Sequence, residues 1–204
     1  RNKSTYAHSR CLDLIVWGDN INTRSTVRRL TTVELNMLKL SMYQRSVIVG
    51  LLLSDGWLSY ASANNKYPRL GFEQTIRQSH YVWFVYWALA NCCFSLPRYT
   101  NRTRKGTDLI SVIFTTRHLP CLVELYNQFY QDKKKVICSN IYDLLTPVAL
   151  AHFIMGDGSA VSGGLRISTD SFTQIEVVNL MNVLIVKYRL KCTLHIINGK
   201  HRIL

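Results

Sequence analysis

Two aspartates stand where a carboxylate is unfavourable for stability. Asp55 and Asp157 each follow an apolar stretch and precede a glycine. At the C-terminal end of a helix such a charge is repelled by the negative end of the helix macrodipole. One Asp-Gly pair is a common turn, but two in equivalent positions suggest a reason other than stability, with two turn or capping aspartates as the open alternative. Two carboxylates close together need a shared proton or a cation. In a strongly basic chain, such a pair of oxygen ligands favours Mg²⁺ (or Mn²⁺) as the cation. A metal ion bound in this way is typical of metal-assisted phosphodiester hydrolysis.

Helix start signals precede both aspartates. Ser41-Met-Tyr-Gln44 is a capping box, and Thr146-Pro147 is an N-cap followed by Pro at the first helical position. Each signal opens an apolar helix that reaches Asp-Gly, and Gly56 is expected to take the left-handed C-terminal conformation. If the two helices pack about a pseudo-twofold axis, the two carboxylates converge at one end.

The segments after each aspartate also match. After Asp55 the alternation and turn signals predict strands over 57–60, 69–75, 97–104 and 109–117, with helices over 79–94 and 120–131. After Asp157 they predict strands over 159–161, 165–169 and 192–197, a helix over 173–189 and a hairpin turn at Asn198-Gly199. This is an internal repeat of helix, hairpin, helix, hairpin and helix, and therefore an α+β fold.

The repeat also predicts the domain organisation. We expect an N-terminal arm over 1–40, a first half-domain over 41–135, and a linker with a second half-domain over 136–204. The chain after Asp157 is about half as long as the stretch from Asp55 to the next cap. We therefore expect a truncated second unit that lacks most of a strand and a closing helix, with an unfinished hairpin at a sheet edge.

The charge balance points to a polyanionic partner. Lys and Arg number 25 against 12 Asp and Glu, for a formal net charge of +13, which suits nucleic acid, an anionic membrane or an acidic protein. The longest apolar run, 47–53, is far shorter than the ~20 residues of a membrane-spanning helix. The six cysteines show neither CxxC nor zinc spacing, and we expect reduced, mostly buried thiols in an intracellular protein.

The two nonapeptides before and including the Asp-Gly pairs carry a family resemblance. Ile48-Val-Gly-Leu-Leu-Leu-Ser-Asp-Gly56 and Leu150-Ala-His-Phe-Ile-Met-Gly-Asp-Gly158 resemble the paired motif of the LAGLIDADG homing endonucleases. The resemblance is to two-motif, single-chain members encoded in fungal mitochondrial introns, and it extends from Leu40 to the C-terminus. The stretches Arg69-Leu-Gly-Phe-Glu-Gln74 and Leu144-Leu-Thr-Pro-Val-Ala-Leu150 are similar to the family as well.

The resemblance implies a fold and an active site. It implies two αββαββα halves, the second incomplete, which form a saddle over DNA with the motif helices at their interface. Asp55 and Asp157 would bind the divalent metal, and Lys135 would be the basic catalytic residue, while the carbonyl of residue 54 is assigned no role. The helix interface would contain Gly50, Leu51, Ala151 and His152. Because His152 stands where the first motif has Gly50, we expect a wider or rearranged helix crossing.

Basic and polar residues of the predicted hairpins are the candidates for DNA contact. They are Arg69, Gln74, Arg98, Arg102, Arg104, Lys105, Arg117, Arg166 and Ser168. Arg reads guanine and Gln reads adenine bidentately, but the sequence does not separate base from phosphate contacts. The aromatic residues of the 79–94 helix lack a strand pattern and are expected in the core: Tyr81, Trp83, Phe84, Tyr86 and Trp87.

Three functions are open at this point. The first is a site-specific double-strand DNA endonuclease of intron homing, a monomer with internal pseudo-symmetry that acts in mitochondria on a long asymmetric site. The second is an RNA maturase that folds a group I intron, and the third is an inactive truncated remnant. Retention of both Asp55 and Asp157 favours the nuclease over the maturase. The short second repeat favours the remnant.

Overall fold

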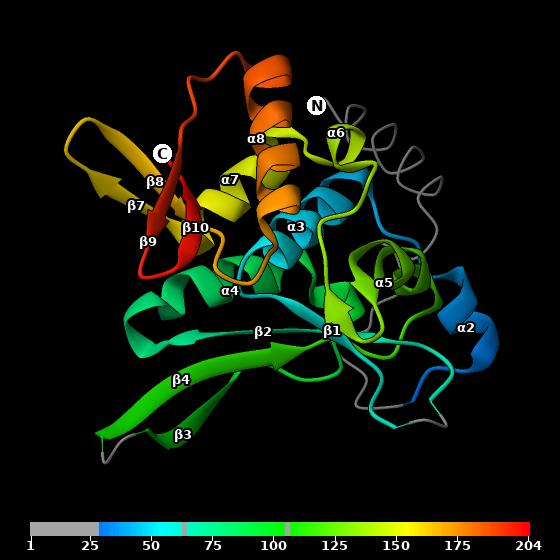
Figure 1. The fold of residues 1–204 in the computed structure, drawn as a ribbon. Helices are drawn as coiled ribbons and strands as arrows, with labels where there is room; N and C mark the ends of the chain where they lie inside the picture. The colour runs from blue at the N-terminus through cyan, green and yellow to red at the C-terminus, as the bar shows by residue number, and fades with distance from the viewer. Residues whose placement is uncertain (1–28, 63–64, 105–106) are drawn as a thin grey trace, which may run out of the picture. The chain divides into compact units, whose positions relative to one another are not determined.

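The computed structural model describes residues 29–62, 65–104 and 107–204, and it leaves the side chains of 102–108 undescribed. The chain divides into two compact units (Figure 1). The first comprises the chain up to Gln44 and Leu58–Val123, and the second comprises Arg45–Trp57 and Glu124–Leu204. The first motif helix, α3 (Met42–Leu53), thus lies almost wholly in the second unit. No helix within the described ranges is long and apolar enough to cross a membrane.

The first unit is built on an antiparallel sheet with the strand order β1-β2-β4-β3. Its elements are α2 (Thr32–Met37), β1 (Trp57–Ser59), β2 (Arg69–Thr75), η2 (Ile76–Gln78), α4 (Ser79–Ala88), η3 (Ala90–Cys92), β3 (Arg98–Arg104), β4 (Thr107–Thr115) and η4 (Pro120–Leu122). The helix predicted over 79–94 ends at Ala88, where the chain continues into the short 3-10 helix η3.

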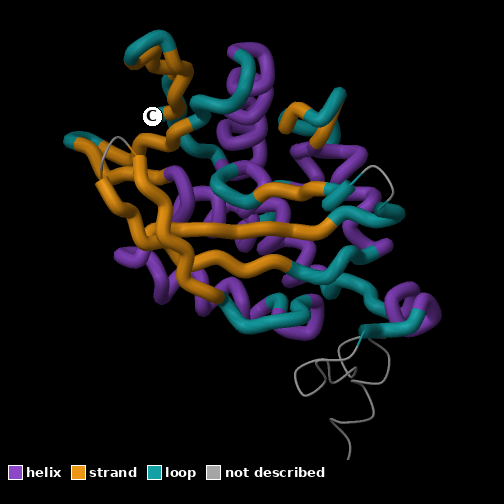
Figure 2. Tube along the Cα trace, turned by 90° about the horizontal axis from the view of Figure 1, so that it is seen from below, coloured by secondary structure: helices purple, strands orange, loops and turns teal. Residues whose placement is uncertain are grey.

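One face of this sheet is covered by α4. The ring of Phe72 contacts Tyr81 edge-on at 5.4 Å, and that of Phe114 contacts Tyr86 at 5.8 Å, so aromatic side chains of β2 and β4 form the core beneath the helix. In Figure 2, which is seen from below, no helix of the described residues lies in front of the strands of this sheet. The apolar face therefore fixes which side chains of each strand point to solvent.

The α4 helix only partly fits its predicted role as a core helix. Tyr81 and Tyr86 are buried, whereas Phe84 and Trp87 are 52% and 53% exposed. The prediction that all five aromatic residues lie in the core was therefore wrong for these two. A helix that covers a sheet buries one stripe of its surface, and Phe84 and Trp87 fall on the opposite side.

The second unit contains a sheet of the same design, ordered β7-β8-β10-β9. Besides α3, its elements are α5 (Val123–Phe129), β5 (Tyr130–Gln131), β6 (Lys134–Lys135), α6 (Ile141–Leu144), α7 (Pro147–Asp157), β7 (Gly158–Val161), β8 (Gly164–Ser168), α8 (Gln174–Tyr188), β9 (Leu194–Ile197) and β10 (Lys200–Ile203). The helices and antiparallel sheets confirm the α+β prediction. The helix predicted over 120–131 ends at Phe129, and the next two residues form β5.

The last hairpin is closed, which corrects the expectation of unpaired groups at an unfinished edge. Asn198 and Gly199 have φ values of 52° and 71°, as a two-residue hairpin turn requires. Strand β10 pairs with β9 on one side and with β8 on the other, so it lies in the interior of the sheet. The second sheet therefore has the four strands of the first, in the same order, although β10 is shorter than β4.

The helix start signals were predicted correctly. The Ser41 hydroxyl accepts from the Gln44 amide at 3.1 Å and the Gln44 side chain accepts from the Ser41 amide at 3.1 Å, which completes the capping box. Thr146 caps α7 through the amide of Ala149 at 3.1 Å. The end of α3 differs from the prediction, because Gly56 does not have a positive φ. It is needed for space instead, since a Cβ there would lie 2.9 Å from the carbonyl oxygen of Leu51.

Candidate active site

The two motif helices cross in close contact inside the second unit. A Cβ on Gly50 would lie 2.4 Å from the carbonyl oxygen of Ala149 and 2.5 Å from Cβ of His152. A Cβ on Gly156 would lie 2.4 Å from Oγ of Ser54. The wider crossing expected from His152 was therefore wrong, because at each contact a glycine of one helix faces a larger residue of the other.

The residues of α7 that form this contact differ in part from those predicted. Ala149 and His152 are buried, whereas Ala151 is exposed, so its assignment to the helix interface was wrong. Residues 149, 152, 153 and 156 follow the three- and four-residue spacing of one helix face, and 151 lies off that face. Burial lowers the pKa of His152, which favours a neutral imidazole at the crossing. Leu51 is fully buried beside Gly56.

The crossing brings Asp55 and Asp157 together. The carboxylate oxygen Oδ2 of Asp55 lies 3.8 Å from the position of a Cβ on Gly156, the residue before Asp157. Burial and then the negative charge of Asp55 raise the pKa of Asp157 to about 7, against the opposing effect of Lys135. Two carboxylates from the ends of two helices, an exposed Asp55 and a half-buried Asp157, thus lie close together, as the repeat predicted.

Lys135 reaches the same place from a small hairpin formed by β5 and β6. Its Nζ donates hydrogen bonds to the carbonyl oxygens of Ser54 at 2.6 Å and Gly56 at 3.0 Å, the residues on either side of Asp55. Burial lowers the pKa of Lys135, while the charges of Asp157 and Asp55 act in the opposite direction. The structure therefore gathers the three residues predicted to be catalytic.

This donor set suits a hard divalent cation. The described part of the chain holds no group of three or more His, Cys, Asp and Glu residues that could bind a metal, so ligands beyond the two carboxylates would be main-chain oxygens, water or phosphate. A carboxylate whose pKa is raised by burial and by a second carboxylate gains most from a bound cation. Asp55 and Asp157 accordingly fit Mg²⁺ or Mn²⁺, and soft-metal ligands such as thiolates are not part of the cluster.

The candidates for DNA contact in the first unit separate by strand register. Glu73 pairs with Ile113 and Ile113 with Arg98, so these three residues lie on one face of the sheet, the face that α4 leaves open. Arg69 lies on the same face because it is four residues before Glu73 on β2. Arg102 and Arg104 belong to β3, and their side chains lie outside the described part of the structure. Gln74 pairs with Val112 and lies on the face of Phe72, so the register separates it from Arg69.

Two further candidates of the first unit have other positions. Arg117 follows β4, and its guanidinium lies over the ring of Phe94 at 4.9 Å. Lys105 lies outside the described residues.

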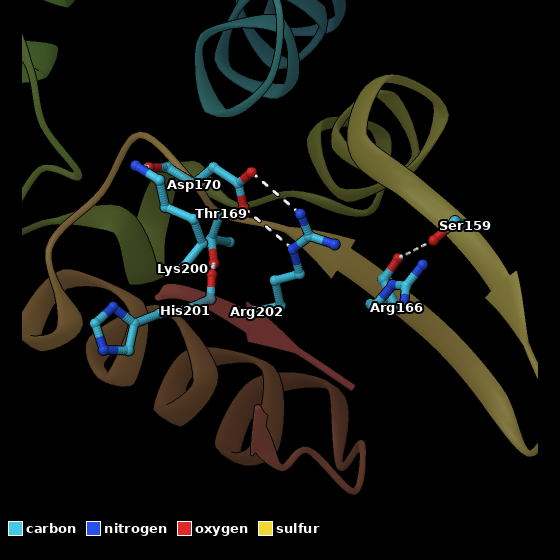
Figure 3. A network of polar contacts seen from close by, with 7 residues as sticks. All are labelled: Ser159, Arg166, Thr169, Asp170, Lys200, His201 and Arg202. Atoms are coloured by element: carbon cyan, nitrogen blue, oxygen red, sulfur yellow. Dashed lines mark hydrogen bonds and ion pairs between the residues drawn. The ribbon is translucent and has the colours of Figure 1, made fainter. Parts of the chain in front are cut away.

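The second unit carries a polar network on the corresponding face of its sheet (Figure 3). Arg166 and Ser168 of β8 share this face with Lys200 and Arg202 of β10, because Arg202 pairs with Ser168. Lys200 and Arg202 were not among the residues predicted to contact DNA. The signal that could have revealed them is the turn at Asn198-Gly199, which predicts a second strand directly after it. On such a strand Lys200 and Arg202 are alternate residues and share one face.

The sequence of this chain is similar to those of intron-encoded proteins. The model of the LAGLIDADG DNA endonuclease family matches residues 45–204. The chain is 30% identical over 185 residues to the cytochrome b mRNA maturase bI2 of Debaryomyces hansenii, across 88% of this chain and 70% of that protein. It is 43% identical over 108 residues to the intron-encoded endonuclease ai4 of Dictyostelium discoideum, across 50% of this chain and 68% of that one.

A solved structure shares the fold. The homing endonuclease I-WcaI, bound to its DNA recognition sequence, superposes with a TM-score of 0.76 at 24% identity, across 94% of this chain and 84% of that chain. Both motifs, their aspartates and Lys135 lie within the segment matched by the family model. The chain belongs to the LAGLIDADG DNA endonuclease family.

Proposed function

We propose that this chain is a site-specific endonuclease that hydrolyses both strands of a DNA duplex at an intron insertion site. The observation that carries the proposal is the convergence of Asp55, Asp157 and Lys135 at the ends of the two motif helices. Membership of a DNA endonuclease family and the names of the relatives support it.

Each of the three residues has a distinct part in this proposal. Asp55 and Asp157 would hold Mg²⁺ or Mn²⁺, which when bound stabilises the charge of the phosphoryl transition state and lowers the pKa of a bound water. The ammonium of Lys135, held by two main-chain carbonyls, supplies a fixed positive charge beside the scissile phosphate. The raised pKa of Asp157 means that its carboxyl must lose a proton before it can bind the metal.

Binding to a long, asymmetric DNA site is supported by the two sheets. Each has an open face with basic side chains, and the residues on the two faces differ: Arg69 and Arg98 in the first unit, Arg166, Lys200 and Arg202 in the second. The net charge of +13 suits phosphate contacts whose strength falls steeply with salt. A single chain with two unlike halves suits a monomer on a site without exact symmetry.

Cleavage of an intron-free allele tests the proposal. The purified chain is incubated with Mg²⁺ and a plasmid that spans the exon junction interrupted by the host intron. One specific double-strand cut, absent with EDTA and absent from a plasmid that already contains the intron, is the expected result. Cleavage without sequence preference would contradict the proposal. The absence of any cleavage by a chain that binds intron RNA would contradict it as well.

A maturase activity is the second candidate, favoured by the name of the Debaryomyces hansenii relative. It predicts that the chain binds a group I intron RNA and promotes its splicing, and that replacing both Asp55 and Asp157 by Asn leaves this activity intact. The two activities are separable by that double variant. The same relatives support a mitochondrial location, which organelle fractionation with an antibody to the chain would test.

A further inference from the structure

Arg202 occupies an interior position on the open face of the second sheet. It lies on β10, between Ser168 of β8 and His195 of β9. The neighbouring Ile203 points to the opposite face, where it lines an apolar cavity with Leu150 of α7 and Leu184 of α8. Arg202 is therefore on the side that the helices leave uncovered, and near the middle of the sheet.

Asp170 fixes the plane of the Arg202 guanidinium. Nε of Arg202 donates to Oδ1 of Asp170 and Nη2 donates to Oδ2, both at 3.2 Å, as the dashed lines in Figure 3 show. The carboxylate itself is held in place because Thr169, which is buried, donates its hydroxyl proton to the carbonyl oxygen of His201 at 2.6 Å. This contact and the ion pair together tie the end of β8 to β10.

The ion pair leaves one hydrogen-bonding edge of the guanidinium for a ligand. The side chain of Arg202 is 21% exposed. Asp170 uses the edge formed by Nε and Nη2, whereas the edge formed by Nη1 and Nη2 has two further donors in the same plane. On the adjacent strand Arg166 has a buried Nε without a hydrogen-bond partner among the described residues. Two planar donor groups with spare capacity thus lie on one face of β8 and β10.

We infer that Arg202 is a specificity-determining residue that reads a guanine edge in the DNA major groove, and that Asp170 is its positioning residue. The inference rests on the proposed DNA-binding function. A guanidinium whose charge is balanced by a carboxylate adds little to the attraction for phosphate, but it keeps the rigid fork that matches O6 and N7 of guanine. Base reading therefore fits this pair better than a phosphate contact.

Selection from a pool of randomised DNA duplexes tests the inference. The full chain is incubated with the pool in Ca²⁺ in place of Mg²⁺, and the bound duplexes are sequenced. Wild type is expected to enrich guanine at one position, and Arg202→Ala to reduce that preference by about ten- to a hundredfold. Arg202→Lys keeps the charge but loses the fork, and it is expected to lose the preference equally.

Two further variants separate positioning from folding and from charge. Asp170→Asn is expected to weaken the same guanine preference. The base preferences at the other positions of the selected duplexes, and the midpoint of thermal unfolding, are expected to equal those of wild type. Lys200 lies on the same face of β10 and is exposed, and its Nζ donates to the main-chain oxygen of Asp170 at 3.4 Å rather than to its carboxylate. Lys200→Ala is therefore expected to lower the affinity for all sequences evenly.

The outcomes distinguish a failure of the role of Arg202 from a failure of the proposed endonuclease function. The role of Arg202 alone is overturned if wild type selects a specific sequence and Arg202→Ala keeps the same guanine preference. It is also overturned if Arg202→Ala loses affinity evenly for all sequences and its binding depends less on salt. A wild-type pool without any enriched sequence overturns the proposed function, and this inference with it.

Discussion

The ammonium group of Lys135 lies 2.6 Å from the carbonyl oxygen of Ser54, the residue before Asp55. This contact joins a two-stranded hairpin to the end of a motif helix far from it in the sequence. Its geometry is set by β5 and β6, in which Lys135 pairs with Tyr130, and by the stacking of Tyr130 on Tyr126 with ring centroids 4.7 Å apart. Lys135 is thus placed beside the two aspartates by the strand pairing of the hairpin and by the stacking of its tyrosine ring.

Replacing Lys135 by Met is expected to slow DNA cleavage by at least about a hundredfold, with DNA affinity changed only slightly. The side chain keeps its length but loses the positive charge that stabilises the transition state. Single-turnover cleavage and binding in Ca²⁺ measure the two effects. Lys134→Met is the matched control, because Lys134 is exposed and points to the other face of the hairpin. Equal losses of rate in both variants would contradict the role of Lys135.

Lys133→Gly is expected to stabilise the protein by about 0.5–1 kcal/mol. Lys133 has a φ of 63° in the hairpin turn, a left-handed conformation that glycine adopts without a steric penalty. Urea unfolding monitored by circular dichroism measures the free energy. Lys134→Gly, in the strand that follows, is expected to be neutral or destabilising. A loss of stability in Lys133→Gly would show that the turn is not strained.

Gly50→Ala is expected to destabilise the second unit by about 2 kcal/mol or more, because the new methyl group would overlap both Ala149 and His152. Gly164→Ala is the control, since a Cβ on Gly164 meets nothing within 4 Å. Its effect is expected to stay within about 0.5 kcal/mol of wild type. The same urea titration compares the two variants. Equal stability of both would contradict the close helix crossing.

Asp157→Asn is expected to stabilise the metal-free protein relative to wild type, and more so at high pH. The pKa of Asp157 is raised to about 7 in the folded state, so the folded chain holds a proton that the unfolded chain has lost. The contribution of Asp157 to wild-type stability therefore falls as the pH rises from about 4 to about 7. With allowance for solvent screening, the advantage of the variant grows by about 1–2 kcal/mol between about pH 5 and pH 8.

Unfolding in urea with EDTA at the two pH values measures that difference. Asp143→Asn, at an exposed carboxylate of α6, is the control, and its difference from wild type is expected to stay constant. An advantage of Asp157→Asn that does not grow with pH would contradict the raised pKa. Added Mg²⁺ should stabilise wild type more than the variant, because only wild type offers both carboxylates to the cation.

Local rules were enough to predict the elements that carry the site. The cap at Ser41, the cap at Thr146 and the turn at Asn198-Gly199 depend on neighbours in the sequence, and each formed as expected. The convergence of Asp55 and Asp157 followed from the repetition of one apolar helix. The sequence was sufficient here because short-range hydrogen bonding and periodicity determine these features.

The errors concern contacts between distant segments. The exposure of Ala151 and the burial of Ala149 depend on which side of α7 meets α3, and adjacent residues of an apolar helix do not reveal that side. The face of Gln74 and the position of Arg202 beside Ser168 depend on strand pairing across many residues. A shift of one residue moves a side chain to the other face of a sheet, so these positions required the register.

Cleavage by single aspartate variants tests the central claim most directly. The rate of double-strand cleavage is measured for wild type, Asp55→Asn and Asp157→Asn with saturating Mg²⁺, alongside the affinity of each for the same duplex in Ca²⁺. If the two carboxylates share the catalytic metal, each substitution lowers the rate by several orders of magnitude while DNA binding persists. Wild-type cleavage by either variant would contradict the account.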